Sequence, residues 1–196
     1  MGAGTNYGLD FVVRGGDYVI AADGGLAYLQ EACIEADLVI GDFDSLNGNP
    51  DAKNVVHLSP DKDDTDTLAA LRAGLAKGYE NFFIYCGTGG RIEHTLANIQ
   101  CLAFLAKNGK KGWLVDGDAV MSVIAKSISF DENRRGYVSV FAYSDTACKV
   151  SIQGLKYEAR NQELSSDFPI GVSNEFVGKP SRIDVESGLL LLVFPR

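Results

Sequence analysis

The chain has 196 residues and a net charge of −8, from 26 acidic and 18 basic residues. Hydrophobic residues make up 46% of it and charged residues 22%, which is typical of a soluble globular protein and excludes disordered and collagen-like classes. The acidic balance argues against nucleic-acid partners, and the longest apolar run, 189–194, is too short to cross a membrane. Residues 1–8 do not form a signal peptide, so a cytoplasmic location is expected. The four cysteines lack zinc-ligand spacing and are expected to be reduced and mostly buried.

The first half of the chain alternates short apolar segments with helical patterns. Apolar runs predict strands at 17–22, 37–40, 55–58, 81–86 and 112–115. Helical spacing predicts helices over 24–33, 65–77 and 92–107. Continuous apolar strands separated by helices are typical of a parallel sheet that is buried on both faces. We therefore predict an α/β fold, with an N-terminal Rossmann-like, mostly parallel sheet that has helices on both faces.

The two longer helices each show an apolar face. In the 65–77 helix three leucines fall on one side, and a glycine follows the helix as its stop signal: Leu68, Leu71, Leu75 and Gly78. The predicted inner face of the 92–107 helix consists of Ile92, Leu96, Ile99 and Ala103.

The second half of the chain has the period of strands. Apolar and alternating patterns predict strands at 137–143, 149–152, 182–186 and 189–194. Short strands separated by Gly and Asn indicate a small C-terminal antiparallel β-sandwich. We place the boundary between the two parts within 117–123, which gives domains of 1–119 and 120–196.

Aspartates follow the predicted strands of the first half. Asp23 ends the first strand, Asp42 and Asp44 follow the second, and four more lie within 61–66. Ligands of open α/β sheets bind at the carboxyl ends of the strands, where these carboxylates would repel one another without a cation. Mg²⁺ with a bound polyphosphate is the natural compensation. A single aspartate can equally be a turn residue or a helix N-cap, but the i, i+2 spacing of Asp42 and Asp44 on an extended segment favours one shared ion.

A glycine loop lies between the 81–86 strand and the 92–107 helix. It reads Gly87-Thr88-Gly89-Gly90-Arg91. Such a loop lets the backbone approach an anion, the N–H groups of the helix start point outward, and Arg91 adds a positive charge. His94 and Asn98 lie one turn apart, off the predicted apolar face, and are expected to face the ligand.

The chain resembles the thiamine pyrophosphokinase family through five motifs in order along nearly its whole length. They are Ala22-Asp23-Gly24-Gly25, Gly41-Asp42-Phe43-Asp44-Ser45, residues 61–67, residues 89–98 and Ser173-Asn174-Glu175. The resemblance implies transfer of a pyrophosphoryl group from ATP to thiamine, giving thiamine diphosphate and AMP. It also implies Mg²⁺ dependence, an α/β catalytic domain in 1–119 that binds ATP and Mg²⁺, and a thiamine-binding β-sandwich in 120–196. A homodimer with shared active sites is implied as well.

The resemblance assigns roles to particular residues. The predicted Mg²⁺ ligands are Asp42, Asp44 and Asp66. Phosphate and nucleotide contacts are expected from Thr65, Gly87, Thr88, Gly89, Gly90, Arg91, His94 and Asn98. Asp23, Glu93 and Asn98 are expected to orient the substrates, with one carboxylate accepting the hydroxyl proton. Thiamine contacts are expected from Tyr157, Ser173 and Asn174.

Three features differ from the usual family pattern. Glu93 stands where the family usually has Asp, and Tyr157 stands where many members have Trp. The chain begins Met1-Gly2-Ala3-Gly4, where members usually have an apolar strand before a glycine turn, so either a central strand is absent or the start of the sequence is misassigned. Two alternatives stay open: a non-catalytic regulator that binds thiamine or nucleotide, and another Mg²⁺-dependent phosphotransferase.

Overall fold

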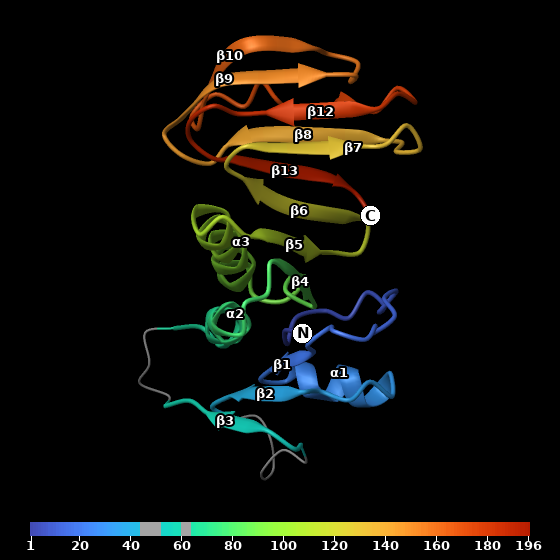
Figure 1. The fold of residues 1–196 in the computed structure, drawn as a ribbon, viewed down its shortest axis with the longest axis vertical. Helices are drawn as coiled ribbons and strands as arrows, with labels where there is room; N and C mark the ends of the chain where they lie inside the picture. The colour runs from blue at the N-terminus through green and yellow to red at the C-terminus, as the bar shows by residue number, and fades with distance from the viewer. Residues whose placement is uncertain (44–51, 60–63) are drawn as a thin grey trace. The chain divides into compact units, whose positions relative to one another are not determined.

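The computed structural model describes residues 1–43, 52–59 and 64–196 (Figure 1). The chain is a mixed α/β protein that divides into two units. Unit 1 comprises Met1–Cys101 and Val115–Gly117, and unit 2 comprises Leu102–Leu114 and Asp118–Arg196. None of the helices in the described ranges combines the length and the apolar character of a membrane-spanning helix.

A three-stranded parallel sheet organises unit 1. It has the order β1-β2-β3, formed by β1 (Ile20–Ala22), β2 (Leu38–Gly41) and β3 (Val55–His57). Every residue of β2 is buried, as predicted for a strand covered on both faces. A parallel sheet is thus confirmed for three of the five predicted strands, whereas the strands predicted at 81–86 and 112–115 are not part of it. β1 and β3 are shorter than their apolar runs.

Two helices cover opposite faces of this sheet. Ala21 packs in one cluster with Leu26 and Leu29 of α1 (Gly25–Glu31). The next residue, Ala22, packs in another cluster with Ala70 of α2 (Asp66–Ala76). Because successive strand residues point to opposite faces, α1 and α2 lie on different sides of the sheet.

The first residues of the chain occupy the place where a strand was expected to be absent. The Met1 ammonium donates to Ile20 O, and Met1 O accepts from Ala22 N–H, each at 2.8 Å. On the other edge of the segment, Gly2 N–H donates to Tyr85 O at 2.8 Å and Gly4 N–H donates to Cys86 O at 2.7 Å. A Cβ on either glycine would lie 2.7 Å from Cys86 O, so side chains are excluded there. No strand is assigned before β1, as expected, but these backbone hydrogen bonds still place the start of the chain between β1 and β4 (Asn81–Tyr85).

The long helix α3 (Ile92–Lys107) has the predicted bounds but a different buried face. Ile92 and Leu96 are 70% and 57% exposed, whereas Ala103 is buried. The buried side consists of Asn98, Cys101, Leu102, Ala103, Leu105 and Ala106. The prediction for Ile92 and Leu96 was wrong because a polar residue, Asn98, is drawn inward by a hydrogen bond with the preceding loop.

Unit 2 contains two groups of strands, and every pairing that its registers define is antiparallel. One sheet has the order β10-β9-β12-β7. In the other, the order within unit 2 is β11-β8-β13-β6-β5. The strands are β5 (Lys111–Val115), β6 (Ala119–Ile124), β7 (Ser127–Phe130), β8 (Tyr137–Ala142), β9 (Thr146–Gln153), β10 (Ala159–Ser165), β11 (Asn174–Glu175), β12 (Ser181–Asp184) and β13 (Leu190–Pro195).

Aromatic rings mark the core of unit 2. The ring of Phe130 on β7 lies edge-on to Phe176 and to Phe194 on β13, with centroids 5.1 and 5.0 Å away. Edge-to-face contacts of this kind add to the free energy gained by burying the rings. The predicted antiparallel strands are confirmed, and β6, β7, β10 and β11 were not predicted.

Candidate active site

The carboxyl ends of β1 and β2 carry the first two predicted aspartates. Asp23 follows β1 directly, and its N–H donates to Ile40 O of β2 at 2.9 Å. Its φ of 48° lies in the left-handed region, which is uncommon outside glycine. Asp42 follows β2 and is half-buried. The two residues therefore come from the ends of neighbouring strands, at the edge where open α/β sheets bind ligands.

The segment after β2 is not extended, although the prediction of one ion shared by Asp42 and Asp44 requires an extended segment. Phe43 has a φ of 58°, so side chains do not simply alternate across it. Its ring is buried and lies edge-on to His57, with centroids 5.0 Å apart. Asp44 lies outside the described residues, so its predicted place beside Asp42 stays a prediction.

Thr65 and Asp66 begin α2. Thr65 is the N-cap, and its Oγ1 accepts a hydrogen bond from Leu68 N–H at 3.2 Å. Asp66 is the first helical residue and is half-buried, where a carboxylate is favoured by the helix dipole. Asp64 is paired with Arg72 at 3.1 Å instead of capping the helix. Asp66 thus lies at the start of the helix, whereas Asp64 belongs to a surface ion pair.

The described residues do not by themselves form a cluster of metal ligands. Within residues 1–43, 52–59 and 64–196, no three His, Cys, Asp or Glu side chains are grouped so that they could hold a metal ion. Of the three predicted Mg²⁺ ligands, Asp42 and Asp66 are described and Asp44 is not. The predicted Mg²⁺ site stays a prediction.

The glycine loop connects β4 to α3 and is held by its surroundings. Gly89 has a φ of 77°, which glycine adopts without strain. Gly87 O accepts a hydrogen bond from Asn98 Nδ2 at 2.7 Å, and Thr88 O accepts one from Thr5 N–H at 2.8 Å. Asn98 was expected to face the ligand, but its amide is buried and bonded to the loop backbone. Thr88 is also buried, whereas Gly89 and Gly90 are exposed.

The first turn of α3 carries exposed charges next to that loop. Arg91 Nε and Glu93 Oε1 form an ion pair of 2.6 Å, and His94 is exposed. The pKa of Glu93 is held below its ordinary value, first by a hydrogen bond from its own backbone N–H and then by Arg91. The structure therefore brings Arg91, Glu93 and His94 together at a helix N-terminus, where anions are favoured.

In unit 2 the predicted thiamine residues lie together. Asn174 Oδ1 accepts from Tyr157 N–H at 2.9 Å, and Asn174 Nδ2 donates to Tyr157 O at 2.7 Å. The Tyr157 ring is 62% exposed. Ser173 has a φ of 60°, and its N–H donates to Ser139 Oγ at 3.1 Å. Both polar atoms of the buried Asn174 amide bond to the backbone of Tyr157. Asn174 therefore positions the exposed ring of Tyr157.

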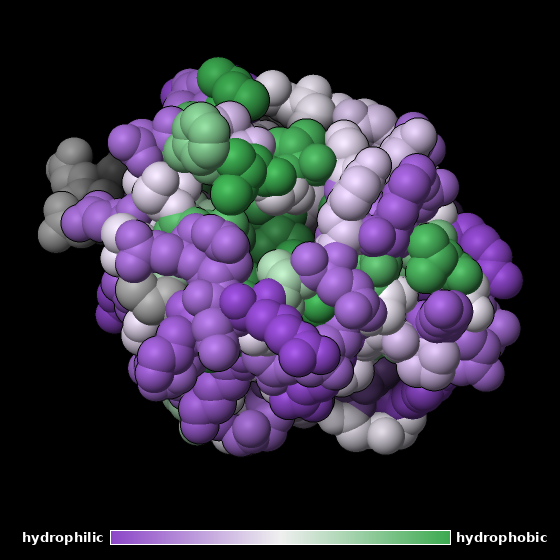
Figure 2. Space-filling model, turned by 90° about the horizontal axis from the view of Figure 1, so that it is seen from above, coloured by the Kyte–Doolittle hydropathy of each residue, from purple (hydrophilic) through white to green (hydrophobic). Residues whose placement is uncertain are grey.

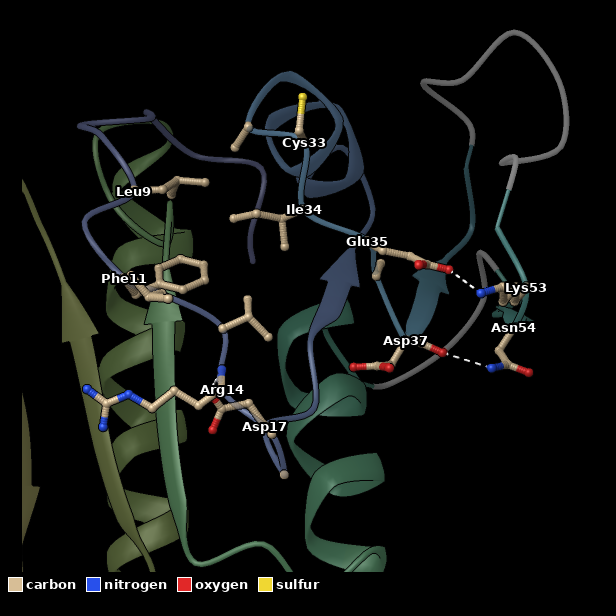
Figure 3. A pocket seen from close by; sticks show the side chains of 16 residues that line it. Leu9, Phe11, Arg14, Asp17, Cys33, Ile34, Glu35, Asp37, Lys53 and Asn54 are labelled. Atoms are coloured by element: carbon tan, nitrogen blue, oxygen red, sulfur yellow. Dashed lines mark hydrogen bonds and ion pairs between the residues drawn. The ribbon is translucent and has the colours of Figure 1, made fainter.

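Unit 1 also has a hollow at the other end of its parallel strands. A cavity of about 770 Å³ is lined by residues 9, 11–17, 32–37, 53 and 54, which precede β1, β2 and β3 (Figure 3). Leu9, Phe11 and Ile34 form an apolar side, and the Glu35–Lys53 ion pair forms a charged side (Figure 3). It lies at the amino ends of the parallel strands, opposite to Asp23 and Asp42, so it is distinct from the candidate site.

Comparison with known proteins identifies the family. Residues 11–114 match the family model described as "Thiamin pyrophosphokinase, catalytic domain", and residues 126–190 match "Thiamin pyrophosphokinase, vitamin B1 binding domain". The chain belongs to the thiamine pyrophosphokinase family. This confirms the resemblance that the five motifs indicated.

Individual thiamine pyrophosphokinases are similar along most of the chain. The Bacillus subtilis enzyme is 28% identical over 184 residues, covering 89% of this chain and 85% of that protein. Thiamin pyrophosphokinase 1 from Caenorhabditis elegans is 28% identical, covering 90% and 78%. A crystal structure of the Bacillus subtilis protein gives a TM-score of 0.82 at 25% identity, covering 91% of this chain and 87% of that one. That of a family protein from Enterococcus faecalis, at 24% identity, covers 100% and 96% with the same TM-score of 0.82.

One carboxylate at a strand end escaped the sequence analysis. Asp116 follows β5, and its Oδ1 accepts from the Thr88 hydroxyl at 2.6 Å. The signal that selected Asp23 and Asp42, an aspartate after an apolar strand, also applies to Asp116.

Proposed function

We propose that the chain transfers the pyrophosphoryl group of ATP to the hydroxyethyl oxygen of thiamine, forming thiamine diphosphate and AMP. One observation carries the proposal. The anchored glycine loop at the start of α3 presents exposed Gly89, Gly90 and Arg91 in a chain that matches both family models. A loop held this way is suited to a phosphate chain, since helix N–H groups and a guanidinium both favour negative charge.

The reaction depends on positioning and on charge. The thiamine hydroxyl must attack the β-phosphorus in line with the departing AMP oxygen. Most of the rate enhancement then comes from orienting the two substrates and stabilising charge on the phosphate oxygens. In this chain the loop N–H groups and Arg91 bind phosphate, and the exposed His94 lies one turn away on the same helix.

The carboxylates of the site fit a hard divalent cation. Asp42 and Asp66 are half-buried and supply oxygen ligands, which Mg²⁺ prefers together with phosphate oxygens and water. Together with Asp44 they are the residues that would hold it. Mg²⁺ would neutralise part of the polyphosphate charge when bound.

The structure separates the roles of the two remaining carboxylates. Glu93 is paired with Arg91 and its pKa is lowered, so it is a weak proton acceptor and suits the task of orienting the guanidinium. Asp23, at the end of β1, is then the better candidate for accepting the hydroxyl proton of thiamine.

Thiamine recognition falls to the second part of the chain. We propose a Rossmann-like catalytic domain over 1–119 and a β-sandwich over 120–196, with Tyr157, Ser173 and Asn174 at the thiamine subsite. The exposed ring of Tyr157 offers a flat surface for the pyrimidine.

A homodimer with shared active sites, in the cytoplasm, completes the proposal. Support comes from exposed apolar side chains just before the thiamine residues: Phe168, Ile170 and Val172. Apolar side chains also gather on the face of the molecule seen from above in Figure 2, beside a larger polar area. Contiguous apolar surface of this kind is typical of protein interfaces.

One assay tests the proposed function. The purified chain is incubated with ATP, Mg²⁺ and thiamine, and the nucleotide products are separated. We expect AMP and thiamine diphosphate in equal amounts. Formation of ADP would instead indicate a simple phosphotransferase, and saturable thiamine binding without turnover would indicate a regulator. Arg91→Met, which keeps the length of the side chain but not its charge, is expected to lose most of the turnover.

A further inference from the structure

The glycine loop makes one further hydrogen bond, which has no role in the proposed mechanism. Besides Thr5 and Asn98, the loop is held by the hydroxyl of Thr88, which donates to Asp116 Oδ1 at 2.6 Å. The same oxygen accepts from Gly117 N–H at 2.8 Å. The second bond fixes the carboxylate on its own backbone, so the loop is tied to the residues that follow β5.

Thr88 is buried, so the direction of its hydroxyl matters. Its side chain is only 4% exposed, and a donated bond of 2.6 Å to a carboxylate is short and charge-assisted. Burying the hydroxyl without such a partner is unfavourable. The hydroxyl proton is therefore committed to Asp116, and the loop offers a phosphate its backbone N–H groups.

Tyr7 packs beside both residues of the Thr88–Asp116 hydrogen bond. A Cβ on Gly89 would lie 2.5 Å from Tyr7 Oη, and a Cβ on Gly117 would lie 3.1 Å from Tyr7 Cδ1. The ring thus lies against the residue after Thr88 and against the residue after Asp116. Neither glycine can carry a side chain without moving Tyr7. The glycine loop and the residues after β5 therefore both pack against this one side chain.

We propose that Asp116 is a positioning residue for the nucleotide: through the Thr88 hydroxyl it fixes the orientation of the N–H groups of the glycine loop. The inference rests on the proposed function, since it concerns the same phosphate-binding loop. A displacement of a fraction of an ångström is enough to weaken several hydrogen bonds to one ligand at once. The effect of losing the connection should fall on ATP and not on thiamine.

The test compares Thr88→Val, which keeps the shape but not the hydroxyl, with Thr88→Ser, which keeps the hydroxyl. We expect Thr88→Val to raise the Kd and the KM for ATP about tenfold, with the KM for thiamine unchanged, and Thr88→Ser to stay within about threefold of the parent. Asp116→Asn retains an acceptor and is expected to resemble Thr88→Ser, whereas Asp116→Ala should resemble Thr88→Val.

Two controls separate positioning from general damage. Ser122→Ala removes a buried hydroxyl that donates to Gly112 O at 2.8 Å, away from the loop, and should lower Tm without changing the Kd for ATP. In the double variant Thr88→Val/Asp116→Ala the losses of ATP affinity should not add, because both changes remove the same bond.

Other outcomes would overturn the inference. Additive losses, an unchanged Kd for ATP in Thr88→Val, or equal losses for ATP and thiamine would each show that the bond does not orient the loop. A Kd for ATP in Asp116→Ala equal to that of the parent would show that the carboxylate does not position the loop. Because ATP binding is measured at equilibrium, these results stand whether or not the parent forms AMP, which is the separate test of the proposed function.

Discussion

Replacing Asn174 with Ala tests how the thiamine subsite is built. The amide bonds to both backbone polar groups of Tyr157, at 2.9 and 2.7 Å, and accepts a third bond from Glu175 N–H at 2.9 Å. Each such bond contributes about 1 kcal/mol net, so we expect the free energy of unfolding to fall by about 2–3 kcal/mol. The KM for thiamine should rise about tenfold, since Tyr157 loses its anchor, while the KM for ATP stays unchanged.

The measurements are urea unfolding and steady-state kinetics with each substrate varied in turn. Asn174→Asp retains both accepted bonds and loses only the donated one, so it should fall between Ala and the parent. Asn108→Ala is a matched control, because an exposed amide there donates to Phe104 O at 2.8 Å and its loss should cost less than about 0.5 kcal/mol. If Asn174→Ala unfolds like the parent but loses thiamine binding, Asn174 contacts the substrate directly and the positioning argument is refuted.

Three further predictions concern the other part of the chain. Asp42→Asn is expected to lower turnover by about a thousandfold or more while the circular dichroism spectrum and Tm are kept, and near-parental activity at low Mg²⁺ would contradict its role as a ligand. Glu93→Asp should remain active and Glu93→Gln should lose much more, because the carboxylate orients Arg91; equal activity of the two variants would show that the charge is unimportant. Burial raises the pKa of the Cys101 thiol to about 11 from 9.0. The unfolded chain therefore loses this proton first, so stability should fall as the pH rises from about 9 to about 11, and Cys101→Ala should flatten that part of the pH–stability curve.

Much of unit 1 could be predicted because its strands are apolar throughout. A strand such as β2, which is buried along its whole length, needs no alternation to be recognised. The bounds of α3 were also predictable from its length and its stop signal. Its buried face was not, because hydrophobic periodicity assumes that apolar residues turn inward, and here the amide of Asn98 is buried while Leu96 is exposed.

Two of the strands that were not predicted, β10 and β11, lack this apolar signal. Most side chains of β10 are exposed and polar, and β11 has two residues, so neither shows an apolar run. In the candidate site, too, some features could be predicted from the sequence and others could not. Positions that depend on local chemistry, such as the N-cap at Thr65, could be read from the sequence, whereas the Thr88–Asp116 bond joins residues that are 28 positions apart.

The segment at the start of the chain has a consequence for motion. Its backbone bonds to β1 on one edge and to the β4 strand and its following loop on the other, so the strand that ends at Asp23 and the loop that begins at Gly87 share one neighbour. A segment bonded on both edges opens only when two rows of hydrogen bonds break together. The amide protons of Gly2, Gly4 and Thr5 should therefore exchange with solvent far more slowly than amides that are exposed to water. Local opening at this position would release the proposed proton acceptor and the phosphate loop in a single event.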